Sequence, residues 1–351
     1  MAVRFGIIGA GAITFPSCRE IAAHPDAEIV AASDPNAERL AKLAQDFHIP
    51  QTFPDSKELM ANDDVDAIYI AVPNALHAPL AEAALDAGKH VILEKPFALN
   101  TREARAVADA ERRSGKRFML GMNQRFVTGA QKAKYLAASG TLGDIYHAKA
   151  FWLRRSGIPR LGTWFGNKQL AGGGSLLDIG VHVMDLALYL MDNFQPEAVS
   201  GATYTQFGNR GLGEGGWGIS DREDITFDVD DFATAIIKLK GGATLNLDVS
   251  WALHQKTPNE MNVNLYGTDA GLSVYPAELY RYAQAEGDYQ VIQNPKADRL
   301  YSHTSRFHNF VNAIQGTEEQ CVTIEQALAV QSIIDAIYES CKTGREVRLD
   351  Q

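Results

Sequence analysis

The chain has 351 residues, of which 46% are hydrophobic and 22% charged, and its formal net charge is −10. This composition is typical of a globular protein with one or two domains. No basic stripe and no apolar run of membrane-spanning length appears, so we expect neither nucleic acid nor a membrane as a partner. The cysteines Cys18, Cys321 and Cys341 lie far apart, which predicts neither a disulfide framework nor a metal site and favours the reducing cytoplasm.

The first third of the chain alternates apolar stretches with amphipathic ones. Apolar runs predict strands over residues 3–8, 28–33, 67–72, 91–93 and 117–121. The intervening stretches predict helices over 14–23, 36–44, 57–60, 77–87 and 102–114. A strand–helix–strand repeat predicts an α/β fold with a doubly wound parallel sheet, to which we assign residues 1–124.

A glycine-rich turn follows the first predicted strand. Gly9 and Gly11, with Ala12 and Ile13 after them, lead directly into a predicted helix. Two glycines in this context permit a tight turn and the close approach of backbone to a pyrophosphate, which the N–H groups at the helix start would bind. The third position of this pattern is Thr14 rather than glycine; its hydroxyl could bond a phosphate, but helix and strand would pack less closely.

Asp34 closes the second predicted strand. A carboxylate at this position accepts hydrogen bonds from the adenosine ribose and repels a 2′-phosphate, so the residue favours NAD over NADP. Ser33 and Arg39 lie nearby and could soften that repulsion. The alternative is that Asp34 only begins the helix that follows Pro35.

Two further strand ends carry polar residues at the same edge of the predicted sheet. Pro73, Asn74 and His77 follow one strand, and Glu94 and Lys95 follow the next. Because ligands bind at the carboxyl edge of open α/β sheets, Asn74 could bond the nicotinamide ribose or carboxamide, and Lys95 could bond a substrate oxygen. By their place at this edge, Pro73, His77, Glu94 and Lys95 are also cofactor-site candidates. The alternative for Lys95 is a lysine that leaves a strand into solvent.

The rest of the chain, residues 125–351, has a different pattern. One helix, 129–138, is followed by apolar stretches that predict strands over 145–155, 198–207, 231–240, 243–251, 261–266 and 272–275. Consecutive strands predict an α+β domain with a large, mostly antiparallel open sheet, and helices over 306–315 and 324–341 end the chain before a short strand. The glycine-rich stretch 208–230 predicts a long loop that acts as a lid or as an arm to a neighbouring subunit. We expect a homodimer or homotetramer through the sheet, because its uncovered face would be apolar.

A second glycine run leads into a helix. Gly172, Gly173 and Gly174 precede Asp178 and His182, whose spacing of four places both on one helical face. Such a pair can serve as acid/base group and orienting carboxylate, although a satisfied core histidine is the usual explanation for a buried imidazole. Several polar and aromatic side chains suit a polyol pocket, or equally an ordinary sheet surface. The substrate-site candidates are Arg125, Trp152, Arg154, Arg155 and Trp164. Asn123, at the junction of the two regions, is a cofactor-site candidate.

Together these motifs resemble the Gfo/Idh/MocA family, which includes glucose–fructose oxidoreductase and inositol dehydrogenase. The matching residues are the Gly9–Gly11 turn, Val72 to His77, Glu94-Lys95-Pro96, and the glycine run that leads to Asp178 and His182. The resemblance implies a Rossmann domain that binds NAD(P), a C-terminal sheet that forms oligomer contacts, and a carbohydrate or cyclitol substrate. It also assigns the catalytic roles to Lys95, Asp178 and His182.

The reaction implied by this resemblance is the reversible oxidation of a ring hydroxyl to a ketone. His182 would take the hydroxyl proton, Asp178 would orient the imidazole, and Lys95 would stabilise the developing alkoxide. Two alternatives remain. A glycosidase that acts by transient redox and elimination would use the same residues, and a non-catalytic regulator would only bind NAD.

Overall fold

A computed structural model describes residues 2–217, 226–283 and 287–349. The chain divides into two compact units. Unit 1 contains Met1–Met122, Gln169–Ala171 and Ser305–Gln331, and unit 2 contains Asn123–Lys168, Gly172–Thr304 and Ser332–Gln351. The predicted division at residues 124 and 125 did not include the return of the chain to unit 1 near its C-terminal end. This return places helix α9, Arg306–Gln315, in contact with strand β5, His90–Leu93.

Unit 1 is built on a six-stranded parallel sheet with the order β3-β2-β1-β4-β5-β6. In chain order its strands are β1 Val3–Ile8, β2 Ala27–Ser33, β3 Gln51–Phe53, β4 Ala67–Ile70, β5 and β6 Phe118–Leu120. Because the strands are parallel, with Ile8 opposite Ser33 and Ile70, their carboxyl ends meet at one edge. The predicted doubly wound sheet is confirmed; β3 was not predicted, because three residues carry too little periodicity to identify a strand.

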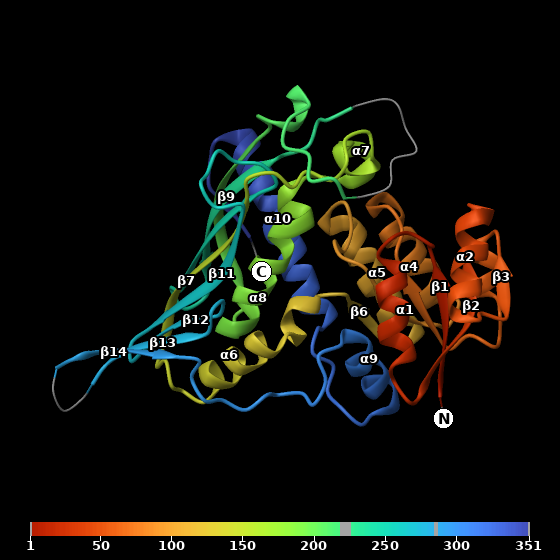
Figure 1. The fold of residues 1–351 in the computed structure, drawn as a ribbon, viewed down its shortest axis with the longest axis horizontal. Helices are drawn as coiled ribbons and strands as arrows, with labels where there is room; N and C mark the ends of the chain where they lie inside the picture. Colours follow the sequence, from red (N-terminus) through yellow and green to blue (C-terminus); the bar gives the residue numbers. More distant parts are fainter. Residues whose placement is uncertain (1, 218–225, 284–286, 350–351) are drawn as a thin grey trace. The chain divides into compact units, whose positions relative to one another are not determined.

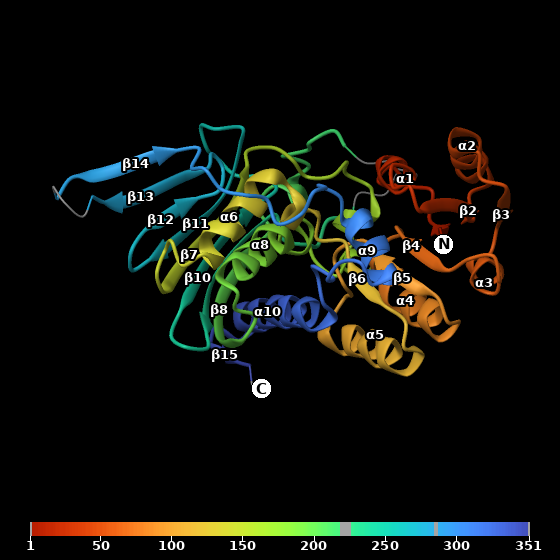
Figure 2. The ribbon, with the colours of Figure 1, turned by 90° about the horizontal axis from the view of Figure 1, so that it is seen from below.

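The helices of unit 1 cover both faces of this sheet. Figure 2 shows α1 and α9 on one face and α4 and α5 on the other. Side chains of Asn36, Asp55 and Asn100 accept a backbone N–H at the starts of α2, α3 and α5, as expected for these residue types. The bounds of the helices are α1 Thr14–Ala22, α2 Ala37–Phe47, α3 Ser56–Met60, α4 His77–Asp86 and α5 Thr101–Ser114.

Unit 2 contains a nine-stranded sheet with the order β14-β13-β12-β11-β7-β10-β9-β8-β15. All neighbouring strands are antiparallel except β7 and β10, which confirms the predicted mostly antiparallel sheet. The hairpin of β13 and β14 was not predicted, because its polar residues hide the alternation typical of a strand. The strands are β7 Ile145–Arg154, β8 Pro196–Tyr204, β9 Phe232–Leu239, β10 Thr244–Ser250, β11 Asn259–Gly267, β12 Gly271–Ser273, β13 Glu278–Tyr282, β14 Tyr289–Gln293 and β15 Val347–Arg348.

Helices cover one face of this sheet. Figure 1 shows α6, Thr128–Ala138, and α8, Val181–Met191, along the same face as the last part of α10, Ile324–Thr343. In the described part of unit 2, no element covers the opposite face in either view. The sequence predicted a long loop over 208–230; residues 218–225 of that loop lie outside the described residues, and its proposed role as a lid or arm stays a prediction.

A helical stretch over Lys168–Met191 joins the short helix α7, Lys168–Ala171, to α8. By length and composition alone it could cross a membrane, which the sequence analysis did not anticipate. Within the structure, 94% of its most apolar window is buried, as in the core helix of a globular protein.

Candidate active site

The glycine turn after β1 has the geometry of a dinucleotide-binding loop. Gly9 adopts φ +98°, and a Cβ there would lie 2.2 Å from the carbonyl oxygen of Ala71, so only glycine fits. A Cβ on Gly11 would meet no protein atom within 4 Å, which leaves open space above the backbone. No side chain caps the start of α1, and Ala12 and Ile13 before it are exposed. The backbone N–H groups of this turn can therefore bind an anion such as a pyrophosphate.

The side chain of Thr14 turns inward from this loop. It is fully buried, and its hydroxyl donates to the carbonyl oxygen of Gly9 over 2.8 Å. The sequence left a phosphate contact open for this hydroxyl; in the structure the hydroxyl instead stabilises the turn by its bond to Gly9. Threonine therefore fits at position 14, where the motif usually has glycine, because its hydroxyl bonds the turn itself.

Asp34 supports the same turn from the end of β2. One carboxylate oxygen accepts the N–H of Ala10 over 2.7 Å, and the other accepts the N–H of Asn36 over 2.8 Å. The residue is half-buried at the carboxyl edge of the sheet. These bonds fix the carboxylate beside the turn, and each oxygen retains a lone pair for a ribose hydroxyl.

The strand end after β4 contributes two buried side chains. The amide of Asn74 donates to the carbonyl oxygen of Ala171 over 2.8 Å, so the side chain predicted to contact nicotinamide also holds a distant segment of unit 1. The ring nitrogens of His77 lie 2.6 Å from the oxygen of Pro96 and 2.9 Å from that of Val72. Burial lowers the pKa of His77. This buried, doubly engaged imidazole has no surface for the predicted cofactor contact; it fastens the loop that carries Lys95.

Glu94 and Lys95 leave β5 at the centre of this edge. Glu94 is buried and forms an ion pair with Arg306 of α9, and it also accepts the hydroxyl of Tyr69 over 2.6 Å. It was predicted to bind the cofactor, but this enclosed position makes it an internal anchor instead. Lys95 is half-buried and precedes the buried Pro96.

These features of unit 1 fit a dinucleotide. The open space at Gly11, the uncapped helix start and the fixed carboxylate of Asp34 match a pyrophosphate with a ribose beside it. Pro73, which precedes the 3₁₀ turn Asn74–Leu76, lies at the same edge. Bound NAD would bring a hydride acceptor to this edge, near the strand end that carries Lys95.

In unit 2, the triple glycine has a packing cause. A Cβ on Gly174 would lie 1.8 Å from the backbone oxygen of Asp230, and one on Gly173 would lie 1.9 Å from the hydroxyl of Tyr338. The buried carboxylate of Asp230 accepts four hydrogen bonds. The donors are the N–H groups of Gly174 and Leu176 and the hydroxyls of Ser175 and Tyr338. Asp230 therefore caps the start of the helix that carries Asp178, a role that the sequence analysis missed.

The predicted Asp178–His182 pair lies on a modified helix. Residues Leu176–Gly180 form a π-helical turn, and α8 begins at Val181, so the spacing is not purely α-helical as predicted. Turns of this kind often occur at functional sites. Asp178 accepts the indole N–H of the fully buried Trp251 over 2.8 Å. The ring of Trp152 lies 6.1 Å from that of His182. Trp251 was not singled out, because a tryptophan after a strand gives no sequence signal of such a contact.

Only some of the other substrate-site candidates in unit 2 lie near Asp178 and His182. The guanidinium of Arg154 stacks on Trp152 at 4.6 Å; burial lowers the pKa of Arg154, and the charge of Asp178 opposes that shift. Arg155 is exposed and donates to the carbonyl oxygen of Lys256. Trp164 stacks on the adjacent Phe165. The structure thus places Trp152 and Arg154 beside the Asp178–His182 pair, whereas Arg155 lies on the surface.

Arg125 is an internal packing residue in the structure. Its side chain is fully buried, and it donates two hydrogen bonds to Asp185 of α8, of 2.8 and 2.5 Å. The rings of Tyr189 and Phe194 lie about its guanidinium. This enclosure leaves no face for the substrate contact that was predicted. Asn123, a predicted cofactor residue, is exposed at the start of a 3₁₀ turn.

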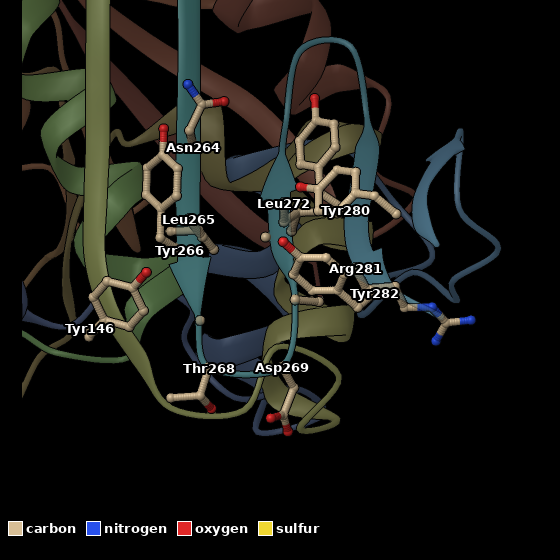
Figure 3. Close-up of a pocket in the computed structure, with 14 residues that line it drawn as sticks. Tyr146, Asn264, Leu265, Tyr266, Thr268, Asp269, Leu272, Tyr280, Arg281 and Tyr282 are labelled. Atoms are coloured by element: carbon tan, nitrogen blue, oxygen red, sulfur yellow. The ribbon is translucent and has the colours of Figure 1, made fainter. Parts of the chain in front are cut away.

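A separate groove lies at the far end of the sheet in unit 2. It is formed by β11, β12 and β13 with the start of β7, and Figure 3 shows that tyrosine rings dominate its lining. Neither Asp178 nor His182 lines this groove. Its lining includes Tyr146, Asn264, Tyr266, Asp269, Tyr280, Arg281 and Tyr282.

The arrangement defines an NAD-binding oxidoreductase class, and comparisons with known proteins agree. Residues 3–122 match a family model described as an oxidoreductase family with an NAD-binding Rossmann fold, and residues 130–273 match the GFO/IDH/MocA C-terminal domain. A D-glucoside 3-dehydrogenase from Escherichia coli (strain K12) is 30% identical over 99% of this chain and 97% of its own length. The chain belongs to the Gfo/Idh/MocA family.

Two further relatives extend this comparison. A levoglucosan dehydrogenase from Pseudarthrobacter phenanthrenivorans (strain DSM 18606 / JCM 16027 / LMG 23796 / Sphe3) is 29% identical over 76% of this chain and 68% of its own length. A solved structure of levoglucosan dehydrogenase with NADH and levoglucosan superposes with a TM-score of 0.87 at 24% identity, and covers 100% of both chains. The predicted family, fold class, oxidoreductase activity and NAD cofactor are confirmed.

Proposed function

We propose that this chain is an NAD-dependent dehydrogenase of D-glucosides that oxidises the C3 hydroxyl of the pyranose ring to a ketone. The proposal takes its substrate class from the relative that matches almost the whole chain. The chemistry is supported by three residues: Lys95 at the carboxyl edge of the NAD-binding sheet, and Asp178, which is held by Trp251, with His182 four residues after it.

Each of these residues has a distinct task in the reaction. His182 accepts the proton of the hydroxyl. NAD, when bound, would supply the acceptor for the hydride that leaves the carbon bearing this hydroxyl. Asp178 fixes the orientation and tautomer of the imidazole, and Trp251 fixes Asp178. Lys95 donates a hydrogen bond to the same oxygen and stabilises its developing negative charge. Trp152 and Arg154 bind the sugar through its apolar ring face and its hydroxyl oxygens.

The test uses methyl β-D-glucopyranoside and its 3-deoxy analogue as matched substrates. NADH absorbance should rise with the glucoside and not with the analogue, and the product should carry a ketone at C3. Lys95→Ala and His182→Ala should each lower kcat by about a hundredfold, because each removes an acid–base or alkoxide-stabilising group.

Two outcomes would contradict this proposal. One is a Lys95→Ala variant with near-normal kcat. The other is release of p-nitrophenol from p-nitrophenyl β-D-glucoside without net NADH, which is the signature of the redox glycosidase.

We further propose that the chain forms a homodimer or homotetramer through the uncovered face of the sheet in unit 2, and that it acts in the cytoplasm. Large apolar side chains are exposed on the strands and loops of this sheet, among them Tyr146, Tyr204, Ile236 and Tyr266. They alternate with polar groups such as the bonded pair Thr234 and Asp248, so the face is mixed rather than purely apolar as first expected. Light scattering at micromolar concentration that gives a monomer mass would rule this assembly out.

A further inference from the structure

A buried ionic network in unit 1 includes Glu94, the residue that precedes Lys95 in the chain. Arg306, the first residue of α9, donates from Nη2 to Glu94 and to the hydroxyl of Ser17, and from Nη1 to the carbonyl oxygen of Gly121 over 2.8 Å. The hydroxyl of Tyr69 donates to the same oxygen of Glu94 over 2.6 Å. The network thus joins α9, α1 and the ends of β4, β5 and β6.

The surrounding chain is shaped to admit this guanidinium. A Cβ on Gly121 would lie 2.4 Å from Nη1 of Arg306, so any side chain at that position would displace it. Arg306 and Glu94 are both more than nine-tenths buried. A charge is removed from water at such a site only when a partner compensates it, and here the two side chains compensate each other.

Two cations, Arg306 and Lys95, favour the ionised form of Glu94. Burial alone would raise the pKa of Glu94, but the charge and hydrogen bonds of Arg306, more than the charge of Lys95, lower it. Glu94 therefore stays ionised, and Arg306 is its main partner. Without Arg306, the nearest cation in sequence to this buried carboxylate is the adjacent Lys95.

We propose that Arg306 is a positioning residue for the reaction: by binding Glu94 it keeps this carboxylate from capturing the ammonium of Lys95, so that Lys95 can bond the substrate oxygen. The inference rests on the proposed role of Lys95 in oxidation of the sugar. It assigns a catalytic consequence to a contact between residues 212 positions apart in the chain.

The experiment compares Arg306→Gln, Arg306→Lys and a matched control, Asn309→Ala. Asn309 is buried one turn further along α9, where its side chain bonds the 318–321 segment and does not touch Glu94. Arg306→Gln should lower kcat about tenfold or more, with the KM for the glucoside and the Kd for NAD changed less than about threefold. Arg306→Lys, which keeps the charge, should recover most of kcat. Asn309→Ala should lower the Tm but leave kcat within about twofold.

A double-mutant cycle with Lys95→Ala separates positioning from simple anchoring of the fold. If Arg306 acts through Lys95, then Arg306→Gln should reduce the residual kcat of Lys95→Ala less than about twofold. The neutral pair Glu94→Gln with Arg306→Gln removes the competing charge, so it should fold and be faster than Arg306→Gln alone.

The inference would be overturned if the effects of Arg306→Gln and Lys95→Ala on kcat multiplied in the double variant. It would also be overturned if the variant Glu94→Gln with Arg306→Gln were no faster than Arg306→Gln alone. Equal kcat losses in Arg306→Gln and Asn309→Ala would do the same. Wild-type activity and Lys95→Ala are measured first, and a failure at that stage counts against the proposed function rather than against the role of Arg306.

Discussion

Trp251→Phe should slow the reaction through a single lost hydrogen bond. The substitution keeps a buried aromatic ring but removes the N–H that Asp178 accepts over 2.8 Å. A hydrogen bond to a charged group contributes about 1.5–3 kcal/mol, so its full loss in the transition state corresponds to a fall of roughly 10- to 150-fold in kcat. The smaller ring also leaves a cavity in the core, which should lower the free energy of unfolding by about 1–3 kcal/mol.

Steady-state kinetics and thermal melts separate these two effects of Trp251→Phe. The KM for the glucoside should change little, because Trp251 is fully buried. The acid limb of kcat against pH should move to higher pH, since the carboxylate of Asp178 loses a donor that favours its ionised form. Trp217→Phe is the control, because its indole N–H donates to the backbone oxygen of Gly157 and not to Asp178. A Trp251→Phe enzyme with wild-type kcat and an unchanged pH profile would refute the proposed role of this bond.

Three further outcomes follow from contacts described above. Asp34→Ser removes the charge that opposes a 2′-phosphate, so the ratio of kcat/KM for NAD to that for NADP should fall at least about tenfold. Gly174→Ala places a Cβ against the backbone of Asp230, and urea unfolding should show a loss of about 2–4 kcal/mol. Burial and two nearby cations lower the pKa of His90 from 6.5 to about 4, and its Nδ1 accepts the N–H of Arg117. Between pH 6.5 and about 4, His90 is therefore protonated in the unfolded chain but neutral in the folded one. The Tm should fall as the pH drops through this range, and His90→Asn should reduce this dependence of Tm on pH.

The parallel sheet of unit 1 could be predicted because its strands are short apolar runs between amphipathic helices. The glycine turn and Asp34 were also identifiable, since backbone geometry and charge at a strand end carry local signals. Gly9 shows this most clearly: its positive φ and its contact with Ala71 admit no other residue. The strands β3, β13 and β14 were missed because three residues, or a polar hairpin, show no clear periodicity.

Other roles could not be predicted because they depend on contacts between distant segments. Glu94 and His77 occupy positions at the ligand-binding edge, and the sequence therefore suggested cofactor contacts for both. Their actual partners are Arg306, more than 200 residues away, and backbone oxygens on two loops. Arg125 was misplaced for the same reason, since only tertiary packing brings Asp185 and two aromatic rings around its guanidinium.

These distant contacts share one physical function in the two units. A side chain with a proposed catalytic role, Lys95 or His182, belongs to the same short segment as a carboxylate, Glu94 or Asp178. In each unit that carboxylate is held by a donor from a remote element: the guanidinium of Arg306 in one case and the indole of Trp251 in the other. Because each donor is buried, it can hold its carboxylate without competition from water. The residues with proposed catalytic roles could thus be predicted from local sequence, whereas the remote residues that hold the neighbouring carboxylates are evident only in the folded chain.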